Sequence, residues 1–183
     1  MKGLSSASNL LFISQELALP DGGVAVTREV TLPLNTLDRQ IFVVTDIQAY
    51  VGGGQFTQSS AVPNQDVDYS WSVSTQDLDN ILVPGATGDI GNPRVLAAGG
   101  SAQSIGATSG DVLRHSWSTA TSTTGTPSDY LGIIATPDFF LRGQFNNAAG
   151  FGSATLYVRV VGYMATATAD LYAALVTQEL NQN

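Results

Sequence analysis

Two pairs of aspartates are the residues of this sequence that could most directly take part in catalysis or bind a metal ion. Asp66 with Asp68, and Asp77 with Asp79, each place two carboxyl groups two positions apart. Paired carboxylates can act as acid and base in glycoside hydrolysis, and their oxygens suit calcium. Both pairs lie in turn-like segments, where aspartates commonly cap turns and stay solvated. The second pair also lacks the later glycine and glutamate of an EF-hand loop, so we favour the turn interpretation and leave open a calcium ion shared between subunits.

His115 is the single histidine, and the chain contains no cysteine. A Ser-His-Asp arrangement could use only this histidine, with Ser104, Ser116 or Asp111 near it in sequence. Residues 114–117 follow a strand pattern and no nucleophile elbow is present, so we interpret the histidine as a packed residue. Thiolate chemistry, disulfides and zinc sites built from several histidines are excluded by the same counts. We expect no catalytic, cofactor-binding or metal residues, no cofactor, and no enzyme activity.

Two further motifs resemble binding sites, but we interpret both as structural features. Gly85, Gly88 and Gly91 form a Gly-x-x-Gly-x-x-Gly run, but no Lys-Ser/Thr follows it and no helix is expected there, so it does not predict a phosphate-binding loop. Trp71 and Trp117 could stack on sugars, as in carbohydrate-binding modules. Each tryptophan sits in an alternating strand, and we therefore favour packing in a core or an interface.

Apolar and polar residues alternate through most of the chain, in segments that Gly, Pro, Asn and Asp separate. This pattern predicts β-strands joined by turns. Arg28 interrupts one apolar face, which predicts a bulge or a strand end there. Residues 85–110, rich in Gly, Ala and Ser, are predicted to form a long loop with one short strand at most. The tail 169–180 has apolar residues at helical spacing and predicts a short helix that needs a partner surface. The expected strands are 10–15, 24–32, 40–51, 68–74, 80–83, 111–119, 130–135, 139–145 and 152–165.

This order of elements limits the fold class. The strands are not separated by regular helices, which argues against a parallel βαβ sheet. Their spacing is uneven and no internal repeat is found, which argues against a propeller or solenoid. We predict an all-β fold over residues 1–183 as a single domain, a two-sheet β-sandwich with jelly-roll topology, about eight strands and a short C-terminal helix.

The composition indicates a chain that works by assembling. Charged residues make up only 12%, and surfaces poor in charge are common where neighbouring subunits cover them. The net charge is −8 and Lys2 is the only lysine, so attraction to nucleic acid or to an anionic membrane is not expected. No apolar run approaches the roughly eighteen residues of a membrane span. The apolar stretch 9–13 is too short for a signal peptide, so the mature chain is expected to begin at or near Met1.

Three segments near the end of the chain resemble the closing strands of viral jelly-roll coat proteins. They are Tyr-Leu-Gly-Ile-Ile at 130–134, Pro-Asp-Phe-Phe-Leu-Arg-Gly at 137–143, and Ala-Thr-Leu-Tyr-Val-Arg-Val-Val-Gly-Tyr at 154–163. The chain length, the acidic surface and the absent basic arm resemble more specifically the single jelly-roll major capsid proteins of icosahedral double-stranded DNA viruses with an internal membrane. Those viruses infect halophilic archaea and thermophilic bacteria.

The resemblance implies a structural capsid protein that self-assembles into the capsomers of an icosahedral virion. Its partners would be its own copies and other capsid proteins, near an internal membrane without insertion, with no direct nucleic acid contact and no small-molecule substrate. Its location would be the virion shell. Two hypotheses stand beside it. One is a carbohydrate-binding or fibre/adhesin-type β-sandwich using Trp71 and Trp117, and the other is a small hydrolase using an aspartate pair.

Overall fold

The chain is described here from a computed structural model that covers residues 4–6, 9–53, 66–78, 94–105, 112–118, 130–147 and 152–180. These residues contain ten strands, a 3-10 turn η1 (Thr36–Asp38) and a helix α1 (Ala169–Leu180). The strands are β1 (Leu4–Ser6), β2 (Leu11–Leu19), β3 (Val26–Thr31), β4 (Gln40–Gly53), β5 (Asp66–Ser74), β6 (Val95–Ile105), β7 (Val112–Ser118), β8 (Gly132–Ile134), β9 (Asp138–Asn147) and β10 (Ala154–Ala167).

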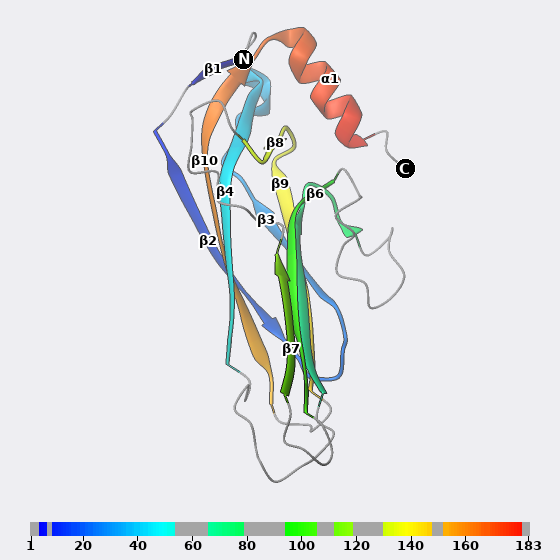
Figure 1. Cartoon of the computed structure of the whole chain (residues 1–183). Coiled ribbons are helices and arrows are strands. Elements are labelled where there is room, and N and C mark those ends of the chain that lie inside the picture. The colour runs from blue at the N-terminus through cyan, green and yellow to red at the C-terminus, as the bar shows by residue number, and fades with distance from the viewer. Residues whose placement is uncertain are drawn as a thin grey trace.

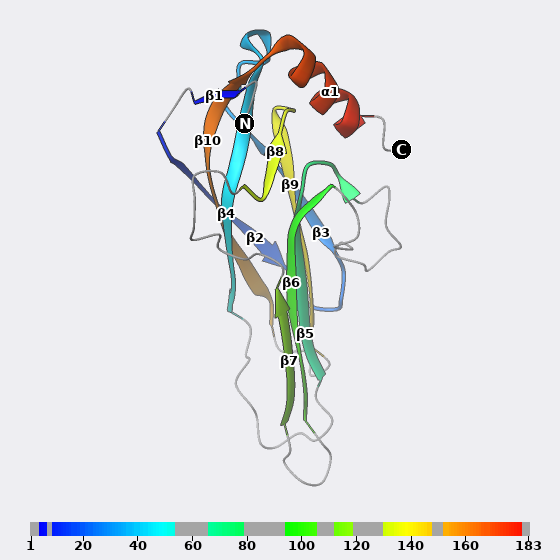
Figure 2. The same ribbon diagram turned by 45° about the horizontal axis from the view of Figure 1, so that its top comes forward.

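The strands pair into two antiparallel sheets with a jelly-roll order, as Figures 1 and 2 show. Sheet A follows the order β1-β10-β4-β8, and β2 also pairs with β10; sheet B follows the order β3-β9-β5-β6-β7. When β1 and β7 are set aside, the other strands, numbered along the chain, follow 1-8-3-6 in one sheet and 2-7-4-5 in the other. This is the jelly-roll arrangement of two Greek keys, and it confirms the predicted fold class.

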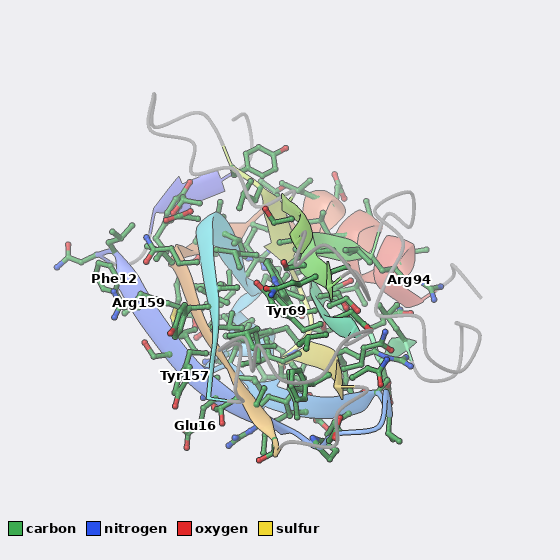
Figure 3. The ribbon with its side chains drawn as sticks, turned by 60° about the horizontal axis from the view of Figure 1, so that its bottom comes forward. Phe12, Glu16, Tyr69, Arg94, Tyr157 and Arg159 are labelled. Carbon is green, nitrogen blue, oxygen red and sulfur yellow. The ribbon has the colours of Figure 1, made fainter. Side chains whose placement is uncertain are left out.

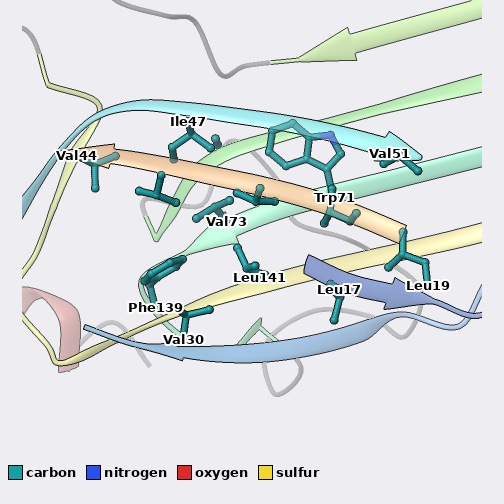
Figure 4. Packing of buried hydrophobic residues seen from close by; sticks show 14 of the residues in the cluster. Leu17, Leu19, Val30, Val44, Ile47, Val51, Trp71, Val73, Phe139 and Leu141 are labelled. Atoms are coloured by element: carbon teal, nitrogen blue, oxygen red, sulfur yellow. The ribbon is translucent and has the colours of Figure 1, made fainter. Parts of the chain in front are cut away.

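The main core lies between the two sheets and is built by alternation along each strand (Figure 4). On β10, Leu156, Val158 and Val160 are buried, whereas Tyr157 and Arg159 between them are exposed. Burial of these apolar surfaces supplies the main driving force for folding. Sheet B contributes to the same core the buried side chains of β5 and β9, namely Trp71, Val73, Phe139, Leu141 and Phe145.

The first half of β4 is buried on both faces because α1 covers the outer side of sheet A. Phe42 and Val44 belong to the core between the sheets. Ile41 and Val43 belong instead to a second cluster with the helix, which also includes Ala135, Ala165, Ala167, Leu171, Tyr172, Leu175 and Val176. The predicted helix and its need for a partner surface are therefore both confirmed. Among the described residues, no helix has the length and apolar character that a membrane crossing requires.

A β-bulge in the middle of β4 separates this helix-covered half from the rest of the strand. The register with β10 shifts where Val161 pairs with Asp46 and Gly162 pairs with Val44, which leaves Thr45 unpaired. The hydroxyl of Thr45 donates to the carbonyl oxygen of Val161 at 3.1 Å. Beyond the bulge the inward residues of β4 have changed parity, as expected when one extra residue is inserted.

The predicted interruption at Arg28 is wrong. The pairing of β3 with β9 runs from Val26 to Thr31 with no register shift. The guanidinium of Arg28 leaves the core and donates from Nη1 to the carbonyl oxygen of Glu16 on β2, at 2.6 Å. β2 and β3 are edge strands of the two sheets, so a long side chain can keep its charged end outside the core there.

The predicted loop over residues 85–110 is wrong in its central part, which forms β6. The expectation failed because Gly, Ala and Ser carry no apolar period, although here small residues are what the sheet requires. Gly99 pairs with Trp71 on β5, and a Cβ atom at Gly99 would lie 2.7 Å from Cζ2 of that indole. β1 was not predicted, and β2 runs to Leu19, beyond the expected 10–15. The expected strand 80–83 lies outside the described residues.

Replacing Gly99 with Ala should destabilise the fold, because the added methyl group meets the buried ring of Trp71. We expect a loss of about 1–3 kcal/mol in the free energy of unfolding, the usual range for overpacking. Urea denaturation measures it. Ala102→Val, an exposed position on the same strand, is the control and should change little. A Gly99→Ala variant as stable as the parent would contradict the close approach.

Candidate functional site

The aspartates singled out in the sequence do not gather into a site. The Oδ1 atom of Asp68 on β5 accepts a hydrogen bond from Nδ2 of Asn146 on β9 at 2.9 Å. Asp77 lies beyond the end of β5 and has interactions of its own. The side chain of Asp66 and the whole of Asp79 lie outside the described part of the chain. Within that part, no three His, Cys, Asp or Glu side chains gather where they could hold a metal ion.

The histidine and its sequence neighbours can be followed only through the backbone. His115 on β7 pairs with Ala102 on β6, whereas Ser104 pairs with Leu113. Ser116 is exposed. The side chains of His115, Ser104 and Trp117 lie outside the described atoms, as do Asp111 and the glycines Gly85, Gly88 and Gly91.

The burial of Trp71 decides between its two predicted roles, sugar stacking and packing. Its indole is 5% exposed and packs in the core between the sheets. The packing interpretation of this residue is therefore confirmed, and it cannot serve as a sugar-stacking platform on the surface.

The outer side of sheet A carries a surface that the sequence analysis did not assign. Beyond the part covered by α1, side chains of β2, β4 and β10 point outward; Figure 3 shows Phe12, Glu16, Tyr157 and Arg159 on one flank, away from Tyr69 between the sheets. We call this surface the tyrosine face and define it by Phe12, Ser14, Glu16, Gln48, Tyr50, Tyr157 and Arg159. No described segment of the chain packs over it, since α1 contacts the other part of the sheet.

Strand register orders these side chains into two rows across three strands. One row runs Glu16, Tyr157, Tyr50, and the next runs Ser14, Arg159, Gln48. The rows are two residues apart along each strand, which corresponds to about 7 Å. Side chains within a row are direct cross-strand neighbours.

Tyr50 and Tyr157 form a stacked pair, with ring centroids 6.2 Å apart and an angle of 26° between the ring planes. They are 68% and 45% exposed, so the stack presents aromatic surface to solvent. Gly52 makes this arrangement fit, because a Cβ atom there would lie 2.8 Å from Cε1 of Tyr50 and 3.3 Å from Cε2 of Tyr157. Both rings therefore lean toward the end of β4 and away from the row that contains Arg159.

The space left by the leaning tyrosines is a shallow hollow of about 650 Å³. Side chains of the two rows wall it, and Arg28 reaches its rim from sheet B. Gln15, Ala49 and Val158 lie between the rows with their side chains on the opposite face, so their backbone forms the floor. An aromatic pair beside an arginine is the chemistry of binding hot spots. Nothing in the two rows pairs a nucleophile with a base.

The sequence indicated which side chains of β10 belong to this face, but not which residues of the other strands join them. The alternation over 154–163 places Tyr157 and Arg159 on the side opposite Leu156, and the structure confirms that separation. What alternation cannot give is the pairing partner, so Tyr50 and Glu16 could not be assigned to the same surface.

Comparison with known proteins gives structural likeness alone. No family model and no curated protein sequence matches the chain. Solved structures similar to it include the unassembled pentamer of Merkel cell polyomavirus VP1, at 9% identity and a TM-score of 0.45, covering 92% of this chain and 100% of that one. VP1 of trichodysplasia spinulosa-associated polyomavirus in complex with sialylated glycooligomers has 10% identity and a TM-score of 0.46, and apo chimpanzee polyomavirus VP1 has 6% and 0.45, both with the same coverage. The jelly-roll assignment rests on strand order and not on these scores.

If the tyrosine face is not needed for folding, its aromatic residues should be replaceable at low cost. We expect Tyr50→Ala with Tyr157→Ala to lower the free energy of unfolding by about 1 kcal/mol, the worth of an exposed aromatic pair. Trp71→Ala, which empties a core position, should cost about 3–5 kcal/mol. Urea denaturation compares the two. Equal losses would mean that the tyrosine pair holds the fold together and is not a free surface.

Proposed function

We propose that this chain is a structural viral capsid protein that self-assembles into the capsomers of an icosahedral virion. The observation that carries the proposal is the tyrosine face, an aromatic surface that no described segment covers although α1 covers the adjoining part of the same sheet. Tyr, Phe and Arg are enriched in protein interfaces, and four of the seven residues of the face, Phe12, Tyr50, Tyr157 and Arg159, are of these types. The jelly-roll order supports the proposal, since viral capsid domains are among the proteins built this way.

The finer assignment follows the resemblance of the closing strands. We place the chain among single jelly-roll major capsid proteins of internal-membrane viruses, as one domain over residues 1–183. Its partners are its own copies and other capsid proteins in the virion shell. With a net charge of −8 and a single lysine, it has little to offer phosphate groups, so contact with the genome is not part of its role. A membrane between shell and genome would account for this, with the chain near that membrane and not inserted.

The role is non-catalytic and uses no cofactor or small-molecule substrate. Asp68 is engaged with Asn146, as a structural aspartate would be. The carbohydrate-binding alternative loses its first aromatic residue, because Trp71 is in the core. Carbohydrate binding could instead use Tyr50 and Tyr157, whose exposed stack beside Gln48 could hold a sugar ring. The experiment below separates the two roles.

The mass of the native assembly in low and high salt tests the proposed function. We expect sedimentation and negative-stain electron microscopy to find regular oligomers or shells, well above the 19.1 kDa of one chain, in at least one salt condition. A glycan array is run in parallel with the parent chain and with Tyr50→Ala, Tyr157→Ala. A chain that stays monomeric in every salt condition, and binds a glycan through these two tyrosines, would overturn the coat assignment in favour of the alternative.

A further inference from the structure

Glu16 and Arg159 are diagonal neighbours on the tyrosine face, one on β2 and one on the adjacent strand β10, and both are exposed. Glu16 pairs in register with Tyr157, and Arg159 follows two residues later on β10. The Cβ atoms of such diagonal neighbours lie about 7–8 Å apart. Within the described residues, neither the carboxylate of Glu16 nor the guanidinium of Arg159 has a bonding partner. The face therefore offers one carboxylate and one guanidinium without a partner in the described part of the chain, while the guanidinium of Arg28, held by the carbonyl oxygen of Glu16, lies at its rim.

Exposed apolar surface is concentrated around these two charges. Seven large apolar side chains are exposed among the described residues. Four of them belong to the outer side of β2, β4 and β10 or to the residue just before β2, namely Leu10, Phe12, Tyr50 and Tyr157. Aromatic residues and arginine at the centre of a contact are the usual source of binding energy between proteins.

We propose that a second copy of this chain packs on the tyrosine face across a two-fold axis, with Glu16 of each copy against Arg159 of the other. When two identical faces meet, the axis lies in the plane of the contact. An axis that bisects the Glu16–Arg159 diagonal exchanges the two positions, so it forms both ion pairs at once. Tyr157 stands beside this axis with its ring leaning away from the row of Arg159, so the rings of Tyr157 and Tyr50 form the aromatic edge of the contact.

Charge complementarity selects a second copy over other occupants. A polyanion such as nucleic acid would meet Glu16 as well as Arg159, and a basic partner would meet the reverse mismatch. A face with a carboxylate and a guanidinium at positions that a two-fold axis exchanges is complementary to itself. Like charges placed opposite one another at a contact repel, which makes this register selective.

The size of the face limits how much surface one contact can bury. Three strands about 4.8 Å apart and nine residues of β2 at about 3.4 Å each give a flat footprint of roughly 400 Å². Stable dimers usually bury about 800 Å² on each partner. The isolated contact is therefore weak and becomes effective when other contacts hold the same copies together, as multivalent assembly allows. This inference rests on the proposed function and adds the face and the pairing to it.

Charge reversal with mutual rescue tests the pairing. The variants are Glu16→Arg, Arg159→Glu and the double variant, and sedimentation equilibrium at low salt measures the dissociation constant of self-association. Each single reversal places like charges opposite one another twice, and we expect it to raise the dissociation constant by about tenfold or more. The double variant should return to within about threefold of the parent. An equal mixture of the two single variants should form mixed pairs, because each supplies what the other lacks.

Glu29→Arg and Arg39→Glu make the same changes in net charge at exposed positions away from the tyrosine face, and both should associate like the parent. Urea denaturation checks that every variant folds. Single variants that associate as well as the parent, or a double variant and a mixture that fail to recover, would overturn the proposed pairing. If the parent assembles in those cases, the coat function stands and only the pairing is lost. A parent that never self-associates would remove both.

Discussion

The register of β10 between β2 and β4 is the constraint on which the rest of the structure depends. Its alternation sends Leu156, Val158 and Val160 into the core and Tyr157 and Arg159 outward. A slip of one residue would exchange the two sets, burying an arginine and exposing three core side chains. Because that exchange is so costly, the register is strongly specified. The tyrosine face is thus fixed by the same interaction that fixes the core.

The outer side of sheet A is divided into a part covered by the chain itself and a part left open. The boundary lies near the bulge of β4, where Thr45 is inserted and the inward residues change parity. On one side, α1 buries Ile41 and Val43. On the other side, Tyr50 remains exposed although it has the size and chemistry of a buried contact residue. A twelve-residue helix covers only part of such a long sheet, and we attribute the remaining cover to other copies of the chain.

The sequence predicted those parts of the fold in which one strand or helix carries its own signal. Residues 68–74 and 152–165 alternate cleanly; the first range lies within β5, and all of the second except its first two residues lies within β10. The tail 169–180 forms the predicted helix. β6 could not be predicted, because small residues selected to fit beneath Trp71 leave no apolar period. Arg28 misled the analysis because its partner, the carbonyl oxygen of Glu16, belongs to the other sheet.

The candidate site was less predictable than the fold for a related reason. Aspartates, a histidine and tryptophans drew attention as residue types, yet Trp71 is in the core and Asp68 is tied to Asn146. The tyrosine face is assembled from three strands that are distant in sequence, and only their register brings Tyr50 beside Tyr157. Alternation shows that a side chain points outward but not which neighbours share its surface.

The central claim is that sister copies cover the tyrosine face, the part of the outer side of sheet A that α1 does not cover. Hydroxyl-radical footprinting of the native assembly and of the dissociated chain measures this directly, since it reports solvent access at individual aromatic side chains. The account predicts that Phe12, Tyr50 and Tyr157 are oxidised readily in the dissociated chain and are protected in the assembly. Equal oxidation of these three residues in both states would show that the assembly forms through another surface and would contradict the account.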